Sequence, residues 1–146
     1  MRIENNILIP ELARLLAEGK EVRFTPSGVS MRPFIEGDKD SVILAPFVDR
    51  QTPHVGQIVL AKTETSDKSS LYVLHRIIGI TKDGIFRLQG DGNLTGEERC
   101  QRSNIYGFVR QIEAPSGRSK LLTKGRLWYH LRPFRPFLLK IYRHLR

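Results

Sequence analysis

The chain has 146 residues, of which 40% are hydrophobic, and this is the size and composition of one folded domain with a buried core. Its single cysteine, Cys100, excludes an internal disulfide and a paired-cysteine metal site. The formal charge is +9, and residues 1–113 hold 15 basic and 15 acidic residues, whereas residues 114–146 hold nine basic and no acidic residues. We therefore expect any partner of this tail to be anionic.

The start of the chain does not read as a secretory signal. Its apolar cluster, Ile7 to Ile9, is short and is followed by Pro10 and Glu11. No apolar run reaches the roughly 18 residues that a membrane-spanning helix needs, and an unpaired cysteine fits a reducing compartment. The sequence predicts a cytoplasmic protein that can also contact a membrane surface through its tail.

The first predicted element is a short helix over residues 10–18, because proline suits the first helical turn and Gly19 is a natural stop. Apolar and polar residues then alternate from Val22 to Phe24, which indicates a strand. Short segments rich in β-branched residues predict further strands at residues 41–45, 57–62, 71–80, 85–89 and 105–112. Residues 63–70 are polar and predict an exposed loop. Residues 20–113 are therefore expected to form one mostly antiparallel β domain.

The tail differs from the rest of the chain. Pro133 and Pro136 divide it into pieces. After Pro136 the apolar residues fall on one helical stripe and the basic residues on another: Phe137, Leu138, Ile141 and Leu145 against Lys140, Arg143 and His144. This basic amphipathic segment can lie on an anionic membrane or pack a few apolar residues against the domain, and the sequence favours neither.

Three positions in the β region are candidates for chemistry: Ser30, His75 and Asp91. Taken one at a time, each residue is better explained by a structural role than by a catalytic one. The serine can cap a turn, the histidine can be a hydrogen-bonded residue of a half-buried strand, and an aspartate before a glycine is typical of a tight hairpin. Only their combination points to a reaction.

Together, these residue types suit nucleophilic catalysis. A serine hydroxyl is protonated at neutral pH and needs a base within hydrogen-bond reach. Imidazole, with an ordinary pKa of about 6.5, can accept that proton and return it later. A carboxylate on the other ring nitrogen fixes the tautomer and stabilises the imidazolium. A nearby glycine gives backbone N–H groups access to a developing oxyanion. Order along the chain alone does not establish such a site, because any domain of this size offers a similar trio.

Four motifs in sequence, S-G-V-S-M-R-P followed by G-D, then V-G-Q-I-V-L, L-H-R-I-I-G-I and G-D-G-N, resemble the type I signal peptidase and LexA-like serine peptidase superfamily. The resemblance covers residues 25–109. It implies a mainly β fold of coiled antiparallel sheets, here with a short N-terminal helix and a basic helical C-terminal tail. The implied organisation is an N-terminal helix and lead-in strand (1–24), a peptidase-like β domain (25–113) and a basic amphipathic tail (114–146).

The resemblance implies that Ser30 is the nucleophile and His75 the general base. Histidine is typical of the archaeal and endoplasmic-reticulum branch, while lysine fills this position in bacterial signal peptidases and LexA-like repressors. Gly28 and Met31 would support the turn or the oxyanion hole. Because Gly28 stands where some signal peptidases offer a hydroxyl to the oxyanion, we expect the donors here to be backbone N–H groups.

Two carboxylates are candidates for orienting His75. The G-D-N-like motif of the family corresponds to Gly90, Asp91 and Asn93, and a second acid follows it by six residues in the histidine branch. That second place holds Glu97. We expect Asp91 to orient the imidazole, with Glu97 as the alternative. The resemblance implies no metal and no cofactor.

The sequence thus favours a serine endopeptidase that cleaves a leader or signal-like segment of another polypeptide, with small side chains expected before the scissile bond. A self-cleaving regulator of the LexA type is disfavoured, because the chain shows neither an N-terminal DNA-binding domain nor an Ala-Gly pair. The alternative of a different class is a non-catalytic protein of the same fold that binds an anionic membrane or nucleic acid through its tail. Nucleic acid is the less favoured partner, because no base-reading motif is visible.

Overall fold

The computed structural model describes residues 5–28, 30–48, 51–64, 70–93, 96–120 and 135–145. Three sequence-based predictions fall wholly or partly outside these ranges. They concern Val29, which precedes the candidate nucleophile, residues 65–69 of the expected loop at 63–70, and residues 121–134 of the tail, including Pro133.

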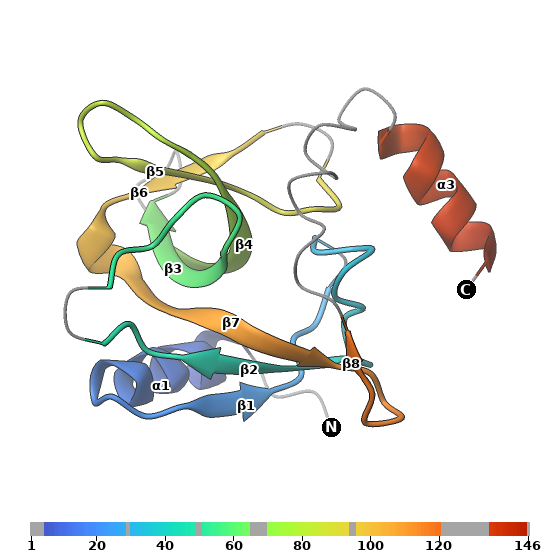
Figure 1. The fold of residues 1–146 in the computed structure, drawn as a ribbon, viewed down its shortest axis with the longest axis horizontal. Helices are drawn as coiled ribbons and strands as arrows, with labels where there is room; N and C mark the ends of the chain where they lie inside the picture. Colours follow the sequence, from blue (N-terminus) through green and yellow to red (C-terminus); the bar gives the residue numbers. More distant parts are fainter. Residues whose placement is uncertain are drawn as a thin grey trace.

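The described chain is mainly β (Figure 1). Its strands are β1 (Val22–Phe24), β2 (Ser41–Ala45), β3 (Ile58–Glu64), β4 (Ser70–Ile80), β5 (Phe86–Gln89), β6 (Glu98–Cys100), β7 (Ile105–Glu113) and β8 (Ser119–Lys120). Its helices are α1 (Asn5–Ala17), the short 3₁₀-helix η1 (Arg102–Asn104) and α3 (Arg135–Leu145).

The strands form one antiparallel sheet in the order β1-β2-β7-β3-β4-β5-β6, with β8 also paired to β7. The register shifts in the β2–β7, β3–β7 and β4–β5 pairs. Such irregularities bend strands and increase their twist, and Figure 1 shows β3 to β6 curled above the flatter part formed by β1, β2 and β7. The expected class, a mainly β fold with a curled antiparallel sheet and a short N-terminal helix, is therefore confirmed.

Helix α1 begins earlier than the sequence predicts. It starts at Asn5, so Pro10 lies inside the helix and not in its first turn. Its end agrees with the glycine rule: Gly19 adopts φ 84°, and Lys20 N–H donates to the Leu15 carbonyl at 3.1 Å. Together with the Gly19 N–H bond to Leu16, at 3.0 Å, this is a Schellman motif, which satisfies carbonyls at the end of a helix.

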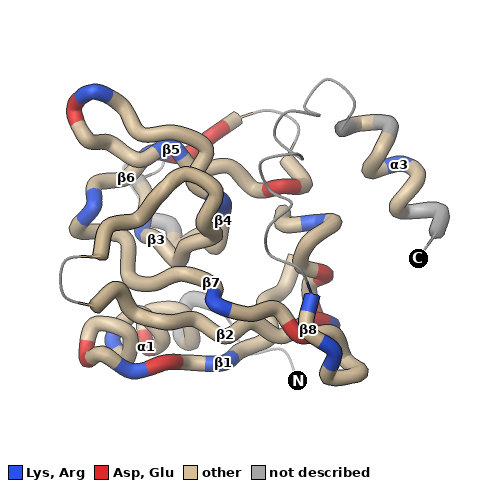
Figure 2. Tube along the Cα trace, viewed as in Figure 1, with Lys and Arg blue, Asp and Glu red and all other residues tan. Residues whose placement is uncertain are grey.

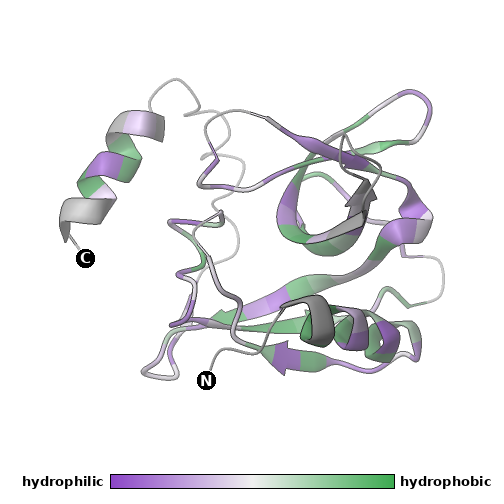
Figure 3. Cartoon of the chain, turned by 180° about the vertical axis from the view of Figure 1, so that it is seen from behind, coloured by the Kyte–Doolittle hydropathy of each residue, from purple (hydrophilic) through white to green (hydrophobic). Residues whose placement is uncertain are grey.

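The core has two parts, one on each side of the bend. In the first, α1 packs on β1, β2 and β7, and Leu16 lies so close to Gly107 that a Cβ there would stand 3.0 Å from its Cδ2 atom. The second fills the curl of β3 to β7 around Val59, Ile77 and Leu88. Figure 3 shows the hydrophobic stretches of the sheet behind α1. Met31 and Leu74 in the first part, and Val73 in the second, are close in sequence to the candidate residues Ser30 and His75.

Candidate active site

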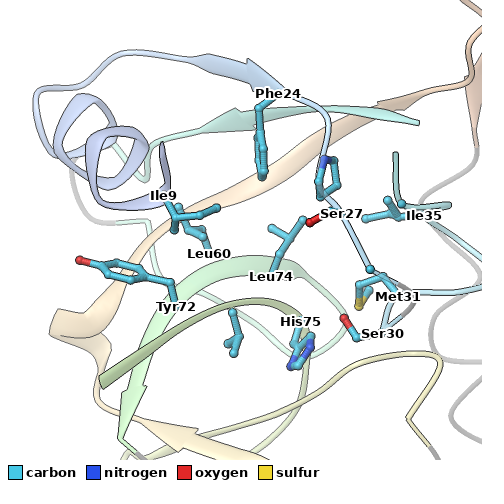
Figure 4. A pocket seen from close by; sticks show the side chains of 14 residues that line it. Ile9, Phe24, Ser27, Ser30, Met31, Ile35, Leu60, Tyr72, Leu74 and His75 are labelled. Carbon is cyan, nitrogen blue, oxygen red and sulfur yellow. The ribbon is translucent and has the colours of Figure 1, made fainter. Parts of the chain in front are cut away.

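Ser30 and His75 line one pocket of about 240 Å³. Ser30 comes from the irregular segment that joins β1 to β2, and His75 from β4. Figure 4 shows the Ser30 hydroxyl and the His75 ring next to each other at one end of the pocket, with Tyr72 at the opposite end. The fold therefore brings together the two residues that the motifs predicted as nucleophile and base.

The segment that bears Ser30 is closed at its base by two close backbone contacts. Asp38 N–H donates to the Pro26 carbonyl at 2.7 Å. A Cβ on Gly37 would lie 2.0 Å from the Gly28 carbonyl oxygen, so this approach requires a glycine. Gly28 itself has φ 94°, a conformation that other residues rarely adopt. These contacts fix the ends of the segment and hold Ser30 at the pocket.

The turn after β5 holds Ser30 from a second side. Gly92 N–H donates to the Ser30 carbonyl at 2.7 Å. A Cβ built on Gly90 would stand 2.4 Å from the same carbonyl oxygen and 3.1 Å from His75 Nε2. The Ser30 carbonyl and the His75 ring therefore both lie next to the position that a side chain at residue 90 would occupy. A larger residue at position 90 would push them apart.

His75 is buried, and its Nδ1 atom is bonded to the Glu98 carboxylate. If Nδ1–H donates to this carboxylate, the neutral ring leaves Nε2 free to accept a proton, which is the tautomer that a general base needs. Nε2 is the atom that faces Gly90, beside Ser30. In the described part of the chain no hydrogen bond joins the Ser30 hydroxyl to His75, and such bonds are often long before substrate binds.

The expectation that Asp91 orients His75 is wrong. Asp91 instead accepts hydrogen bonds from Arg76, at 2.9 and 3.2 Å from Nε and 2.7 Å from the second guanidinium nitrogen. Both side chains of this pair are only 3% exposed. The alternative, Glu97, accepts from Arg87 at 2.7 and 3.0 Å and is also not the partner of His75. The buried Asp91 carboxylate is thus neutralised by a guanidinium.

The Asp91–Arg76 pair ties the parts of the site together. Arg76 also donates to the Gly56 carbonyl at 2.7 Å, and its guanidinium lies 5.0 Å from the centre of the Phe34 ring. Asp91 N–H approaches the sulfur of Met31 at 3.4 Å. Phe34 and Met31 belong to the segment that bears Ser30, so the pair joins this segment to β4 and to the turn after β5. Met31 is itself buried, at 5% exposed.

Sequence reasoning missed Glu98, although a signal for it exists. In a strand, residues two apart share a face, and Cys100 is a small apolar residue suited to the interior. A short strand that ends with Cys100 turned inward would also turn Glu98 inward and leave Glu97 outside. The structure has this arrangement: Cys100 is buried, Glu97 is exposed, and burial raises the pKa of the Cys100 thiol to about 11.

Within the described ranges, no cluster of His, Cys, Asp or Glu side chains is arranged to hold a metal ion. The helices described there are also too short or too polar to cross a membrane. No family model, curated protein or solved structure matches this chain. The motifs and the geometry around Ser30 and His75 are therefore the grounds on which a function is proposed.

Proposed function

We propose that this protein is a serine endopeptidase of the type I signal peptidase and LexA-like kind, with Ser30 as the nucleophile and His75 as the general base. The observation that carries the proposal is the meeting of Ser30 and His75 at one end of a pocket, with His75 Nδ1 held by Glu98. Asp91 then has a structural role in place of the catalytic one.

In this mechanism the Ser30 oxygen attacks the carbonyl carbon of the scissile peptide bond while His75 Nε2 takes the hydroxyl proton. Glu98 stabilises the imidazolium that forms. The imidazolium then protonates the leaving amine as the C–N bond breaks, which leaves an acyl ester on Ser30. Water, deprotonated by His75, hydrolyses the ester and restores the hydroxyl. Backbone N–H groups of the Ser30 segment are the proposed donors to the oxyanion.

An unpaired strand edge supports a polypeptide substrate. Among the described strands, residues 70–75 of β4 pair with β3 alone, Arg76 pairs with both β3 and β5, and the part of β4 after Arg76 pairs with β5. The outer edge of β4 therefore offers its backbone groups next to His75. An extended peptide can bind such an edge through main-chain hydrogen bonds. A leader or signal-like segment, which is unfolded before cleavage, can adopt this extended form.

The test is cleavage of a peptide library, followed by mass spectrometry, with Ser30→Ala and His75→Ala proteins. We expect both changes to lower turnover by more than about 10³-fold, because residues that act as a unit lose activity together. Ser119→Ala and His54→Ala are matched controls, since both residues are exposed and lie outside the pocket. Cleavage that persists in Ser30→Ala and in His75→Ala would refute the mechanism.

We also propose that the basic tail makes a peripheral contact with an anionic membrane surface, which would place a cytoplasmic enzyme near membrane-bound substrates. The support is the charge of residues 114–146 together with the exposure of Lys140 and Ile141 on α3. A non-catalytic protein that uses the same tail is the competing function. It predicts membrane or nucleic-acid binding in a protein that cleaves no peptide.

A further inference from the structure

The pocket beside Ser30 and His75 is uncharged, and its lining combines apolar side chains with polar groups such as those of Ser27, Ser30 and His75. None of its described lining residues is Asp, Glu, Lys or Arg. Its walls are mainly aliphatic or aromatic side chains that Figure 4 shows directed into one space: Ile9, Phe24, Met31, Ile35, Leu60 and Leu74. A charged side chain entering this space would lose its hydration without gaining a partner of opposite charge. The lining therefore disfavours a charged side chain, and its aliphatic and aromatic walls favour an apolar one.

The volume of the pocket indicates the size of that side chain. An apolar cavity of about 150 Å³ is large enough to bind benzene, and this pocket measures about 240 Å³. The methyl group of an alanine would leave most of it empty. Unfilled apolar space forfeits dispersion contacts with the walls, so a larger apolar group binds better than a methyl group.

The walls are set by the fold and do not depend on a ligand. Ile9 comes from α1, whose position is fixed by the contact of Leu16 with Gly107. Leu60 belongs to the central strand β3 and is fully buried. At the far end stands Tyr72, whose ring lies 6.0 Å from that of Tyr106 and 5.6 Å from the Lys62 ammonium. Helix, sheet and Tyr72 together give the pocket a fixed depth.

We propose that this pocket binds a bulky apolar side chain of the substrate, of the leucine, methionine or phenylalanine class, close to the scissile bond. The inference rests on the proposed peptidase function and departs from the small side chains that the family resemblance implies. Two small side chains from alternate positions of an extended substrate are the competing occupants. They would fill the same continuous space less completely.

Binding to the Ser30→Ala protein tests the occupant without requiring turnover. The probes are fluorescent peptides of randomised flanks whose central residue is Ala, Leu, Phe or Asp, and the measurement is anisotropy. We expect Leu or Phe peptides to bind about 10- to 100-fold more tightly than Ala peptides, because each added methylene counts strongly in an apolar pocket. Equal affinities, tighter binding of the Ala peptides, or no binding of any peptide would overturn the inference.

A change in the wall supplies a second test. Ile9→Phe would fill the pocket from the α1 side, away from Ser30 and His75, and should shift the binding preference from Phe towards Ala. Leu12→Phe is the matched control, because Leu12 lies in the same helix and core cluster but does not line the pocket. An equal Phe-to-Ala ratio in both variants would refute the pocket assignment. Tight binding of Leu or Phe peptides without cleavage by the unaltered protein would overturn the peptidase proposal and leave the pocket assignment standing.

Discussion

Glu97 and Glu98 are adjacent in the chain and contact different partners. Glu98 is bonded to His75, and Glu97 is bonded to Arg87 at a site where both side chains are 31% exposed. We predict that Glu98→Gln lowers kcat/KM by about 10²- to 10⁴-fold, because a neutral amide neither fixes the tautomer of the imidazole nor stabilises the imidazolium.

The matched control is Glu97→Gln, which we expect to change kcat/KM by less than about threefold, since an exposed ion pair contributes little. Both variants should be assayed on the same peptide, with thermal unfolding to verify that each is folded. Equal losses in the two variants would show that Glu98 has no special role at His75.

The buried pair of Arg76 and Asp91 predicts a large effect on stability. Removing one partner leaves an uncompensated charge in a site that is 3% exposed, and this typically costs about 3–5 kcal/mol. We therefore expect Asp91→Ala to lower the free energy of unfolding by about that amount in urea denaturation. The double variant Arg76→Met, Asp91→Leu removes both charges and should cost less than the two single changes added together. Strict additivity would contradict the coupling that the structure shows.

At the scale of single residues, the sequence suffices to select Ser30 and His75, which line one pocket, but not the carboxylate that contacts His75. The Ser-Met and His-Arg motifs are local, and each marks its residue directly. Which carboxylate meets the imidazole depends on the register of β6, because a shift of one residue in a strand moves every side chain to the other face. Glu97 and Glu98 are chemically alike, and the one local signal that distinguishes them is the spacing of two residues between Glu98 and the apolar Cys100.

At the scale of elements, the long strands are predictable because their alternation is clear. The predicted strands at 41–45, 71–80 and 105–112 agree with β2, β4 and β7 to within one residue at either end. The short strands β6 and β8 were missed. β6 has two charged residues and one cysteine, and β8 has one serine and one lysine, so neither is long enough to show a clear alternation. Both strands exist because a neighbouring strand supplies hydrogen bonds. Tertiary pairing of this kind is not encoded in a local window.

Helix α3 contacts the segment that bears Ser30. The Tyr142 hydroxyl donates to Glu36 at 2.8 Å, and Glu36 also accepts from Arg32 at 2.7 Å. Burial, and then the hydrogen bond to Glu36, raise the pKa of Tyr142 from 10.0 to about 12. The folded state therefore holds this proton more tightly than the unfolded state does. The stabilisation is complete below pH 10 and is lost as the pH rises towards 12.

This contact gives a prediction for alkaline titration. The difference between the phenolate absorbance curves of the unaltered protein and Tyr142→Phe should have its midpoint near pH 12. Between pH 10 and 12 the unaltered protein should lose thermal stability relative to the variant, because only the former has this proton to lose. A difference curve with its midpoint near the ordinary value of 10.0 would show that Tyr142 does not bind Glu36 in solution.

At the scale of the whole molecule, charge is balanced over the sheet and unbalanced in the tail. Figure 2 shows basic and acidic residues interspersed along the β body. Some of these form pairs across strands, such as Arg23 with Glu113 at 2.6 Å and Arg110 with Glu21 at 3.0 Å. Residues 114–146 contain nine basic residues and no acidic residue, and one of the nine, Lys120, pairs with Asp40 at 2.7 Å. A long-range attraction to anions is therefore expected to act mainly on this part of the chain.

The charge of residues 114–146 predicts salt-sensitive binding to an anionic vesicle. The unaltered protein should sediment with vesicles that contain phosphatidylserine at 0.1 M salt and be released at 1 M, because the Debye length falls from about 10 Å to about 3 Å. The double change Lys140→Glu, Arg143→Glu should weaken binding by at least about tenfold, since each basic residue near such a surface contributes roughly 1 kcal/mol. The double change Lys20→Glu, Lys82→Glu makes an equal change of net charge at exposed positions outside the tail and should weaken binding much less.

Equal losses in the two double variants would mean that vesicle binding follows the net charge of the protein and not the charge of the tail. Salt-sensitive binding to DNA without binding to vesicles would instead favour a nucleic-acid partner, because both surfaces are anionic and only the vesicle also offers an apolar interior for Ile141.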